Sequence, residues 1–526
     1  MRATTATSVT KPRSCHCSGL PDTGMHETNT RAAATLAFPS RKLAQNAFFL
    51  FAGQVASTAL SIVLTALLGR WLGAVEFGIY YLLAVMTTFA YVLVDWGQSA
   101  YLIRESARRH QDSGKLLGGA LVVRVTIAFA AALATGVLVR VIGYDRRIAF
   151  LAPLSVACAL PLALSQTYGY IFRARDRMDF DGTVAVSGKA ITVAVTVPAL
   201  LLGGGLAAVV LMQAVGGAGA LLVALHLAGK FHLRAERPGR GIVHELARGG
   251  APIAAFFVAM AVQPLIDAII LAKLTPPEVV GWYGAARNIM AVLFAPASIL
   301  GSASFPELSR VSDSVVDLRR ALGTTLRLLL GLGALAAVGA FLFADVAVRL
   351  IYGRGHFDSA AVVLQVFAPV LPLLFVDILF GSAITAVGKT KEIAAIKALS
   401  VAISTGLAIP LIILCQARLG NGGIGLALAF GFTESLMLAA FLRLLPHGAV
   451  DRSMLLDLLR AAATAGATVV IFTVLPAMTP WLAVPTCIVV FLALALISRL
   501  ILIADLSEVA DVFRGWLERL RSGAKD

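Results

Sequence analysis

Charged side chains inside apolar stretches are the first candidates for chemistry in this sequence. Asp95 and Arg124 each lie nine residues from the nearest cation of the polar segment between their stretches, which is about 13 Å along a helix. Asp267 and Arg287 lie about five residues inside the ends of two later stretches. A charge inside a membrane costs roughly 3 kcal/mol, so each needs a partner or a water-filled cavity. We therefore predict a pair between Asp95 and Arg124 and another between Asp267 and Arg287, each serving either a substrate or only helix packing.

Glu434 lies near the middle of another apolar stretch, nine residues from Arg443. Its carboxyl group is protonated, paired with a cation of another helix, or exposed to water. These alternatives make it the candidate for coupling to protons or sodium ions. Pro264 lacks an amide hydrogen and follows Gln263, so it predicts a helix bend near Asp267. Such a bend is either a hinge for alternating access or a static feature of packing.

Motifs of enzymes and metal sites are weak in this chain. Residues 15–17 read Cys-His-Cys, but no second pair of ligands lies in that N-terminal segment, so no metal site is expected. Residues 179–181 read Asp-Phe-Asp, the D-x-D pattern of sugar-nucleotide glycosyltransferases, in a polar segment of about ten residues. The sequence holds no phosphate-binding glycine loop and no His-Glu-x-x-His motif. It therefore predicts neither an enzyme nor a bound cofactor.

The elements that hold these residues follow from composition. Of 526 residues, 59% are hydrophobic and 14% are charged, against roughly 25% charged in a soluble domain, and the mean hydropathy is +0.86. Apolar blocks of about 20 residues match the length of helix that crosses a bilayer. A water-soluble fold is excluded, and we predict an all-α polytopic membrane protein of about 14 transmembrane helices. The expected spans are 43–68, 79–103, 117–139, 148–172, 183–203, 206–228, 250–272, 283–308, 322–346, 361–386, 393–416, 423–443, 457–476 and 481–503.

The net charge of +15 comes from cations in the short segments between spans. These cations are typical of topology signals, so no nucleic-acid partner is expected. The six segments on the side of the N-terminus hold more than twice as many Lys and Arg residues as the seven segments on the other side. Both termini are therefore predicted to be cytoplasmic.

An internal repeat relates residues 70–80 to residues 273–283 at an offset of 203 residues, which equals six spans. Because six is even, the two halves point the same way and form a parallel repeat about an axis along the membrane normal. Two six-helix lobes plus two extra C-terminal helices are therefore predicted. The expected parts are a disordered cytoplasmic tail (1–40), an N-lobe (41–228), a cytoplasmic basic linker (229–249), a C-lobe (250–445), the two extra helices (446–503) and an amphipathic cytoplasmic tail helix (504–526).

Several motifs resemble those of a known family of transporters. The motifs are LGRWLG at 68–73, EFG at 76–78, DWG at 95–97, VGWYGAAR at 280–287, FPELSR at 305–310 and GKTK at 388–391. Through them the chain resembles the polysaccharide exporters of the oligosaccharide-lipid flippase family, within the multidrug/oligosaccharidyl-lipid/polysaccharide exporter superfamily. The resemblance covers roughly residues 41–392. Having fourteen spans in place of the common twelve also resembles the lipid II flippase branch.

The resemblance implies a transporter, not an enzyme, that moves undecaprenyl-pyrophosphate-linked oligosaccharide from the inner to the outer leaflet of the bacterial cytoplasmic membrane by alternating access. The expected partners are this polyprenyl-pyrophosphate-linked glycan, the lipid bilayer and polysaccharide assembly proteins. Cleft-facing Arg124 or Arg287 would neutralise the pyrophosphate, with Asp267, Gln263 and Asp95 as further cleft residues. An inside-negative membrane potential favours outward movement by about 2.3 kcal/mol per charge per 100 mV, so the potential, protons or sodium ions could drive export without ATP.

Two alternative functions remain open. A drug/cation antiporter of the same superfamily would need an acidic cavity, for which Glu434 and Asp267 are the candidates. A membrane glycan polymerase or ligase is disfavoured because the predicted outer segments are too short to house an active site.

Overall fold

The computed structural model describes residues 41–474 and 479–501. The predicted N-terminal tail with its Cys-His-Cys segment and the predicted C-terminal tail helix lie outside the described residues. The helices are α1 (Arg41–Asp95), α2 (Gln98–Arg108), α3 (Ser113–Val141), α4 (Arg146–Cys158), α5 (Leu160–Ala174), α6 (Met178–Leu201), α7 (Gly205–Lys230), α8 (Arg240–Leu274), α9 (Pro277–Arg310), α10 (Val315–Leu342), α11 (Ala344–Tyr352), α12 (Asp358–Phe367), α13 (Val370–Ala386), α14 (Thr390–Leu419), α15 (Gly422–Leu444), α16 (Arg452–Val474) and α17 (Pro480–Ile497).

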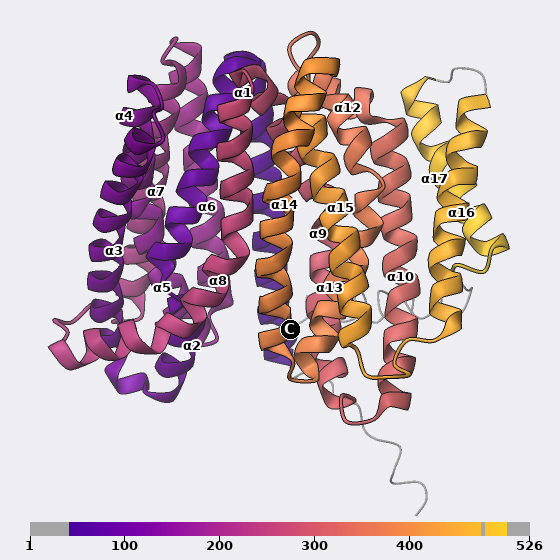
Figure 1. Cartoon of the computed structure of the whole chain (residues 1–526). Coiled ribbons are helices and arrows are strands. Elements are labelled where there is room, and N and C mark those ends of the chain that lie inside the picture. The colour runs from indigo at the N-terminus through magenta and orange to yellow at the C-terminus, as the bar shows by residue number, and fades with distance from the viewer. Residues whose placement is uncertain (1–40, 475–478, 502–526) are drawn as a thin grey trace, which may run out of the picture.

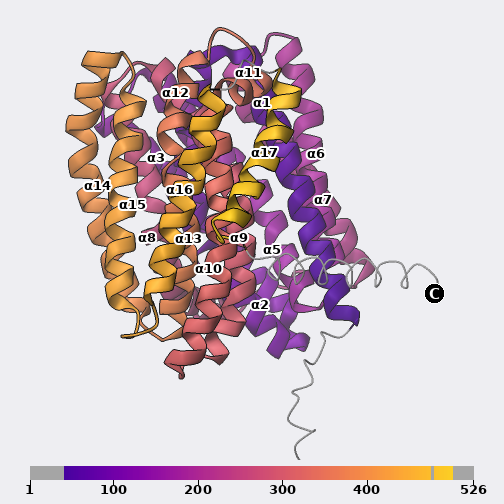
Figure 2. The same cartoon turned by 90° about the vertical axis from the view of Figure 1, so that its right-hand side faces the viewer.

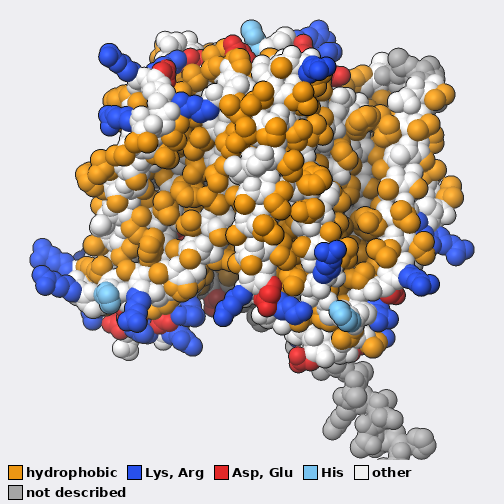
Figure 3. Space-filling view, viewed as in Figure 1, with side chains coloured by type: hydrophobic (Ala, Val, Ile, Leu, Met, Phe, Trp, Pro, Cys, Tyr) orange, Lys and Arg blue, Asp and Glu red, His pale blue; other side chains and the backbone are white. Residues whose placement is uncertain are grey.

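Long apolar helices make up most of the described chain (Figures 1 and 2). Twelve of the described helices are long and apolar enough to cross a membrane, and α12 and α13, bent by 47° at the break between them, pass the same test together. Pro369 stands at this break and lacks the amide hydrogen that would continue the helix. Figure 3 shows a band of hydrophobic side chains with Lys and Arg mainly at its two ends. The prediction of an all-α, multi-pass membrane protein is confirmed.

The first helix holds two of the predicted spans. As a straight helix its 55 residues would be about 82 Å long, far more than the roughly 30 Å of a bilayer. The backbone leaves the helical conformation at Gly73 (φ 72°, ψ 174°). Gly53, before this break, lies against Gly182 near the start of α6, and Gly97, just after α1, lies against Gly250 near the start of α8. Both ends of α1 therefore lie at the same end of the molecule, and α1 is a helical hairpin with its turn at Gly73.

The predicted 203-residue repeat is visible as a contact between equivalent residues. A Cβ atom on Gly78 would lie 1.9 Å from the backbone oxygen of Pro277, and a Cβ atom on Gly281 would lie 2.2 Å from the backbone oxygen of Ala74. Pro277 and Gly281 follow Ala74 and Gly78 by 203 residues. The second arm of α1 and the start of α9 therefore touch through the same surface of each copy, as two subunits do across a two-fold axis. We call these four residues the reciprocal contact.

The helices form two groups that lie side by side. Figure 1 shows α3 to α7 on one side and α9, α10, α12, α13 and α15 on the other, while α8 and α14 run between them. The last two helices, α16 and α17, lie beside α10 at the far edge of the second group. This is the place expected for two helices that follow a complete repeat.

Candidate functional site

Arg124 and Asp95 form the ion pair that the sequence predicts. Arg124, on α3, is fully buried, and its Nη2 donates a hydrogen bond to the carboxylate of Asp95 at the end of α1. Its Nε donates to the side-chain oxygen of Gln98 at 3.1 Å, and its Nη1 donates to the backbone oxygen of Ala163 on α5. Asp95 also accepts a hydrogen bond of 3.0 Å from the hydroxyl of Tyr170. The pair therefore ties α1, α2, α3 and α5 together.

Two tyrosines extend the polar network around this pair. The guanidinium carbon of Arg124 lies 5.1 Å from the ring centroid of Tyr170. Tyr91, which also neighbours Arg124, donates a hydrogen bond of 2.5 Å to Gln166. A buried charge with its hydrogen bonds satisfied holds its helices in one arrangement. The Arg124 side chain is 0% exposed, so a contact between Arg124 and a substrate is not made in this conformation and stays a prediction.

Asp267 and Arg287, in contrast, do not form the predicted ion pair. Among the described residues, Asp267 Oδ1 and Arg287 Nη1 are buried without a hydrogen-bond partner. The guanidinium carbon of Arg287 lies 4.6 Å from the ring centroid of Phe430 and 5.9 Å from that of Phe367. Aromatic faces compete with carboxylates for a guanidinium group. Asp267 and Arg287 interact electrostatically at longer range, and the prediction of a direct pair is wrong for this conformation.

Arg287 belongs to a wider set of charges that we call the charge cluster, made of Asp267, Arg287, Asp377, Lys397 and Glu434. Arg287 interacts electrostatically with Asp267 and Glu434, and Glu434 interacts with Asp377 and Lys397. The five residues come from five helices, α8, α9, α13, α14 and α15. Asp377 is missing from the sequence-based candidates, although it lies nine residues before the end of α13 and meets the same criterion as Glu434.

Unpartnered polar atoms concentrate in the charge cluster. Asp267 Oδ1, Arg287 Nη1, Asp377 Oδ1 and Glu434 Oε2 are all buried without a hydrogen-bond partner among the described residues. The same holds for Nε2 of Gln263, one turn before Asp267. An unsatisfied buried polar group costs about 1–3 kcal/mol. Three of these atoms are carboxylate oxygens, which water, a proton or a cation would satisfy, and two are N–H donors, which need an acceptor such as water.

Pro264 lies inside a continuous helix. α8 runs from Arg240 to Leu274 and contains both Pro252 and Pro264. A proline within a helix removes one backbone hydrogen bond and bends the helix without ending it. The role of Pro264 as a hinge therefore stays a prediction.

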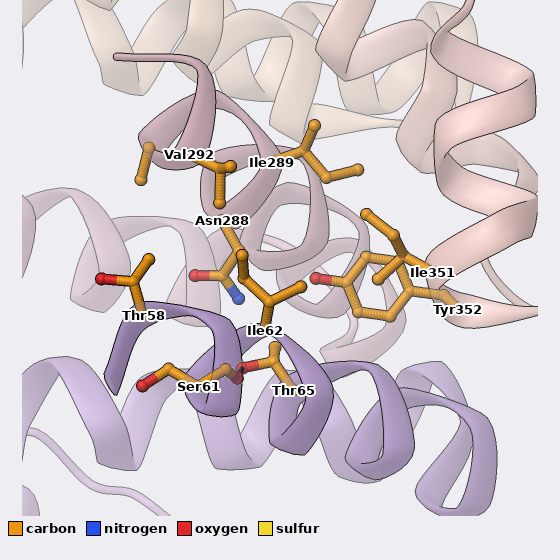
Figure 4. Close-up of a pocket in the computed structure, with 10 residues that line it drawn as sticks. Thr58, Ser61, Ile62, Thr65, Asn288, Ile289, Val292, Ile351 and Tyr352 are labelled. Atoms are coloured by element: carbon orange, nitrogen blue, oxygen red, sulfur yellow. Dashed lines mark hydrogen bonds between the residues drawn. The ribbon is translucent and has the colours of Figure 1, made fainter. Parts of the chain in front are cut away.

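A cavity of about 180 Å³ lies between α1, α9 and α11 (Figure 4). Thr58, Ser61 and Thr65 line it from α1, and Asn288, the residue after Arg287, lines it from α9. Apart from Tyr352, the other lining residues are apolar: Ile62, Ile289, Ala291, Val292 and Ile351. Ser61 Oγ and Thr65 Oγ1 donate hydrogen bonds of 2.9 and 2.7 Å to backbone oxygens one turn earlier, which leaves their lone pairs to accept bonds from a guest. These residues are missing from the sequence-based candidates. Their signal is the recurrence of hydroxyl side chains every three or four residues along one face of a helix.

One end of this cavity is closed by contacts between α1 and α11. Tyr352, at the end of α11, lines the cavity and packs against Gly69, where a Cβ atom would lie 2.3 Å from its ring. Arg70 donates hydrogen bonds to the backbone oxygens of Leu350 and Ile351, the second at 3.0 Å. Ala74 and Gly78, the α1 residues of the reciprocal contact, come soon after Arg70 in the sequence. We call this region, where α1 meets α9 and α11, the closed end.

Solved structures with the same fold are transporters and flippases. The lipid II flippase MurJ, in an inward closed conformation, is 13% identical and matches 86% of this chain and 98% of its own, with a TM-score of 0.66. An inward-facing multidrug resistance MATE family transporter of the MOP superfamily is 15% identical and matches 78% of this chain and 95% of its own, with a TM-score of 0.60. A mutant of the Vibrio cholerae MATE transporter VcmN is 13% identical over 77% of this chain and 96% of its own, with a TM-score of 0.51. These likenesses concern the fold.

The sequence itself matches a family model. No curated protein sequence matches the chain. Residues 43–312, however, match the model described as polysaccharide biosynthesis protein. This match covers α1 and α9, which supply the hydroxyl and amide groups of the cavity, and the helices of the Arg124 network. The chain therefore belongs to the polysaccharide biosynthesis protein family.

Proposed function

We propose that this protein is a flippase that moves undecaprenyl-pyrophosphate-linked oligosaccharide from the inner to the outer leaflet of the cytoplasmic membrane for surface polysaccharide assembly. The observation that carries the proposal is the hydroxyl- and amide-lined cavity between α1 and α9, in a chain of this family. A sugar hydroxyl loses several kcal/mol when it enters hydrocarbon without a hydrogen-bond partner. A passage lined by Thr58, Ser61, Thr65 and Asn288 supplies such partners inside the membrane.

In this proposal the two predicted lobes move relative to each other during transport. The N-lobe (41–228) and the C-lobe (250–445) would rock about the α1–α9 boundary, with Pro264 as a hinge and with both termini and the basic linker in the cytoplasm. In the present conformation the closed end bars the outer side. Rocking opens it, and the polyprenyl chain stays in the lipid while the glycan passes between the lobes.

Two arginines are the proposed phosphate ligands. Arg287 is the stronger candidate, because its Nη1 has no hydrogen-bond partner among the described residues and it adjoins Asn288 of the cavity. Asp267 and Gln263 would orient it. Arg124, with Asp95, becomes a ligand only when the network in the first group of helices opens.

The cavity provides the direct test of the flippase. Ser61→Leu and Asn288→Leu each remove a hydrogen-bonding group worth about 1–3 kcal/mol when a sugar hydroxyl is left unpaired, so we expect transport to fall roughly tenfold. The measurement is the outward movement of a fluorescent lipid-linked oligosaccharide in proteoliposomes. The matched control is Thr126→Leu. Thr126 is exposed on α3 and its hydroxyl bonds only to its own helix, so this substitution adds an apolar side chain without changing the cavity. Drug efflux by the wild type, without movement of the lipid-linked sugar, would overturn the proposal.

The charge cluster supports a coupling site and is the observation that keeps a drug/cation antiporter as the second candidate. Glu434 shares the cluster with Asp267 and Asp377, so three carboxyl groups face two cations. Glu434→Gln is expected to abolish the stimulation of transport by a proton or sodium gradient, an effect of about 5- to 150-fold for a coupling free energy of 1–3 kcal/mol.

The experiment compares transport with and without each gradient in wild type, Glu434→Gln and the control Asp345→Asn, an exposed carboxylate on α11. Coupling at Glu434 is disproved if neither gradient changes the transport rate of the wild type, or if both gradients change the transport rate of Glu434→Gln as much as that of the wild type. Selective export of organic cations that disappears in Glu434→Gln would instead favour the antiporter.

A further inference from the structure

A cation from the first half of the chain caps the C-terminus of a helix in the second half. At the end of α11 the backbone N–H of Gly353 bonds to the oxygen of Arg349 at 3.0 Å. The next two backbone oxygens, of Leu350 and Ile351, belong to the last turn, where no further N–H group of the helix follows. Both accept hydrogen bonds from Arg70 of α1, the second at 3.0 Å. Because the helix dipole places partial negative charge on these oxygens, the cation stabilises the end of α11.

A cation from the second half caps a helix of the first half in a similar way. Just past the last turn of α3 lies Gly143 (φ 78°), whose N–H bonds to the oxygen of Arg140 at 3.1 Å. The backbone oxygen of Gly143 accepts a hydrogen bond of 2.9 Å from Nζ of Lys273, near the end of α8. The same ammonium group lies 4.2 Å from the ring centroid of Tyr144, whose hydroxyl donates a bond of 3.4 Å to the backbone oxygen of Ile269. These contacts tie the end of α8 to the end of α3.

Arg70 and Lys273 occupy the same place in the repeat. Lys273 follows Arg70 by 203 residues, the offset that relates the two copies of the reciprocal contact. Lys273 lines one pocket together with Gly78 and Pro277, and Arg70 comes four residues before Ala74. The two cations therefore lie at the same end of the molecule, on opposite sides of the two-fold axis through the reciprocal contact.

Both cations are held by neutral oxygens. Neither Arg70 nor Lys273 forms an ion pair with a residue in the described part of the chain. The carboxylates near them are engaged elsewhere: Glu76 pairs with Arg147 at 2.6 Å, and Asp145 caps the start of α4. A single exposed cation at a helix end is a weak cap. Each contact can therefore break and form again as the helices around it move.

We propose that Arg70 and Lys273 are a pair of latches that keep the closed end shut, each one a helix cap that one half of the molecule supplies to the other. Opening of the closed end separates both cations from their carbonyl oxygens and leaves the ends of α3 and α11 uncapped at once. Two weak caps that break together stabilise the closed conformation by the sum of their contributions. The proposal rests on the rocking motion in the proposed function, but it does not depend on which substrate is moved.

Distances between two spin labels at the closed end test the latches. Phe150→Cys on α4 and Leu419→Cys at the end of α14 are exposed positions in opposite lobes, and they carry the labels in a full chain without its native cysteines. In double electron–electron resonance spectra, we expect the ratio of the longer-distance to the shorter-distance population to rise about two- to fivefold in Arg70→Gln and in Lys273→Gln. In the double variant the two factors should multiply, because the caps share no residue.

Arg146→Gln is the matched control. Arg146 is an exposed cation three residues after Gly143 and forms no hydrogen bond or ion pair with a described residue, so its loss should leave the distances unchanged. Arg70→Lys and Lys273→Arg retain the cations and should keep most of the shorter-distance population. Thermal unfolding verifies that each variant is folded.

Three results would overturn the latches. An equal shift in Arg146→Gln would show that the loss of any cation at this end has the same effect. Two distances in the wild type, with proportions that the double variant leaves unchanged, would overturn the latches alone. A single short distance in every variant would overturn the latches together with the rocking motion of the proposed function.

Discussion

Gly281→Leu is expected to hold the closed end open and to lower transport by at least tenfold. A Cβ atom at Gly281 would lie 2.2 Å from the backbone oxygen of Ala74 and 3.3 Å from the backbone nitrogen of Gly78. Backbone atoms of two packed helices cannot yield as a flexible side chain does. Overpacking of this kind costs about 1–3 kcal/mol, which corresponds to about a 5- to 150-fold loss of the closed population. The closed conformation would then no longer be the dominant one.

Cysteine labelling measures this shift. Thr65→Cys, introduced into a chain without its native cysteines, reports access to the cavity from outside with a membrane-impermeant maleimide. We expect faster labelling when Gly281→Leu is added. Gly406→Leu on α14 is the matched control, since a Cβ atom there meets nothing within 4 Å. Equal labelling rates in the two leucine variants would contradict the proposal that the reciprocal contact helps to keep the closed end shut.

Arg124→Gln is expected to destabilise the protein by about 3 kcal/mol, the low end of the range for buried pairs, because it leaves the largely buried carboxylate of Asp95 without its cation. Asp95 would keep only its hydrogen bond from Tyr170 and a backbone contact at Ser99. The double substitution Asp95→Asn and Arg124→Gln removes both charges and should restore most of this loss. The measurement is the free energy of unfolding, or the amount of folded protein in the membrane.

The same pair of variants separates a structural role from contact with the substrate. If the pair only holds helices, the double variant is both stable and active. If Arg124 binds the pyrophosphate, the double variant is stable but does not transport. Arg147→Gln, which breaks an exposed pair with Glu76 at 2.6 Å, is the control and should cost less than about 1 kcal/mol. Full stability of Arg124→Gln would contradict the network described for the first group of helices.

The fold and one of the two predicted pairs could be predicted from the sequence because they depend on distances along single helices. The length of an apolar block sets a span, and the 203-residue offset pairs Gly78 with Gly281. Counting residues from a loop gives depth in the membrane, and depth was enough to pair Asp95 with Arg124, since α1 and α3 are neighbours.

The rest of the site depends on the direction in which a side chain leaves its helix, which depth does not determine. Arg287 has the depth of Asp267 but faces Phe430, about 140 residues later in the chain. No local pattern places that ring beside it. The hydroxyls of Ser61 and Thr65 do not stand out in the sequence, because each donates a hydrogen bond to its own helix and the mean hydropathy of the span stays high.

The reciprocal contact has a consequence for the symmetry of motion between the two halves. Matching surfaces that meet about a two-fold axis are the means by which two identical subunits form a closed dimer. Within one polypeptide, the reciprocal contact has this geometry. The two copies nevertheless differ at this contact, where one has Ala74 and the other has Pro277. Only the first of these residues has an amide hydrogen, so the two halves are not mechanically equivalent at the point where they meet.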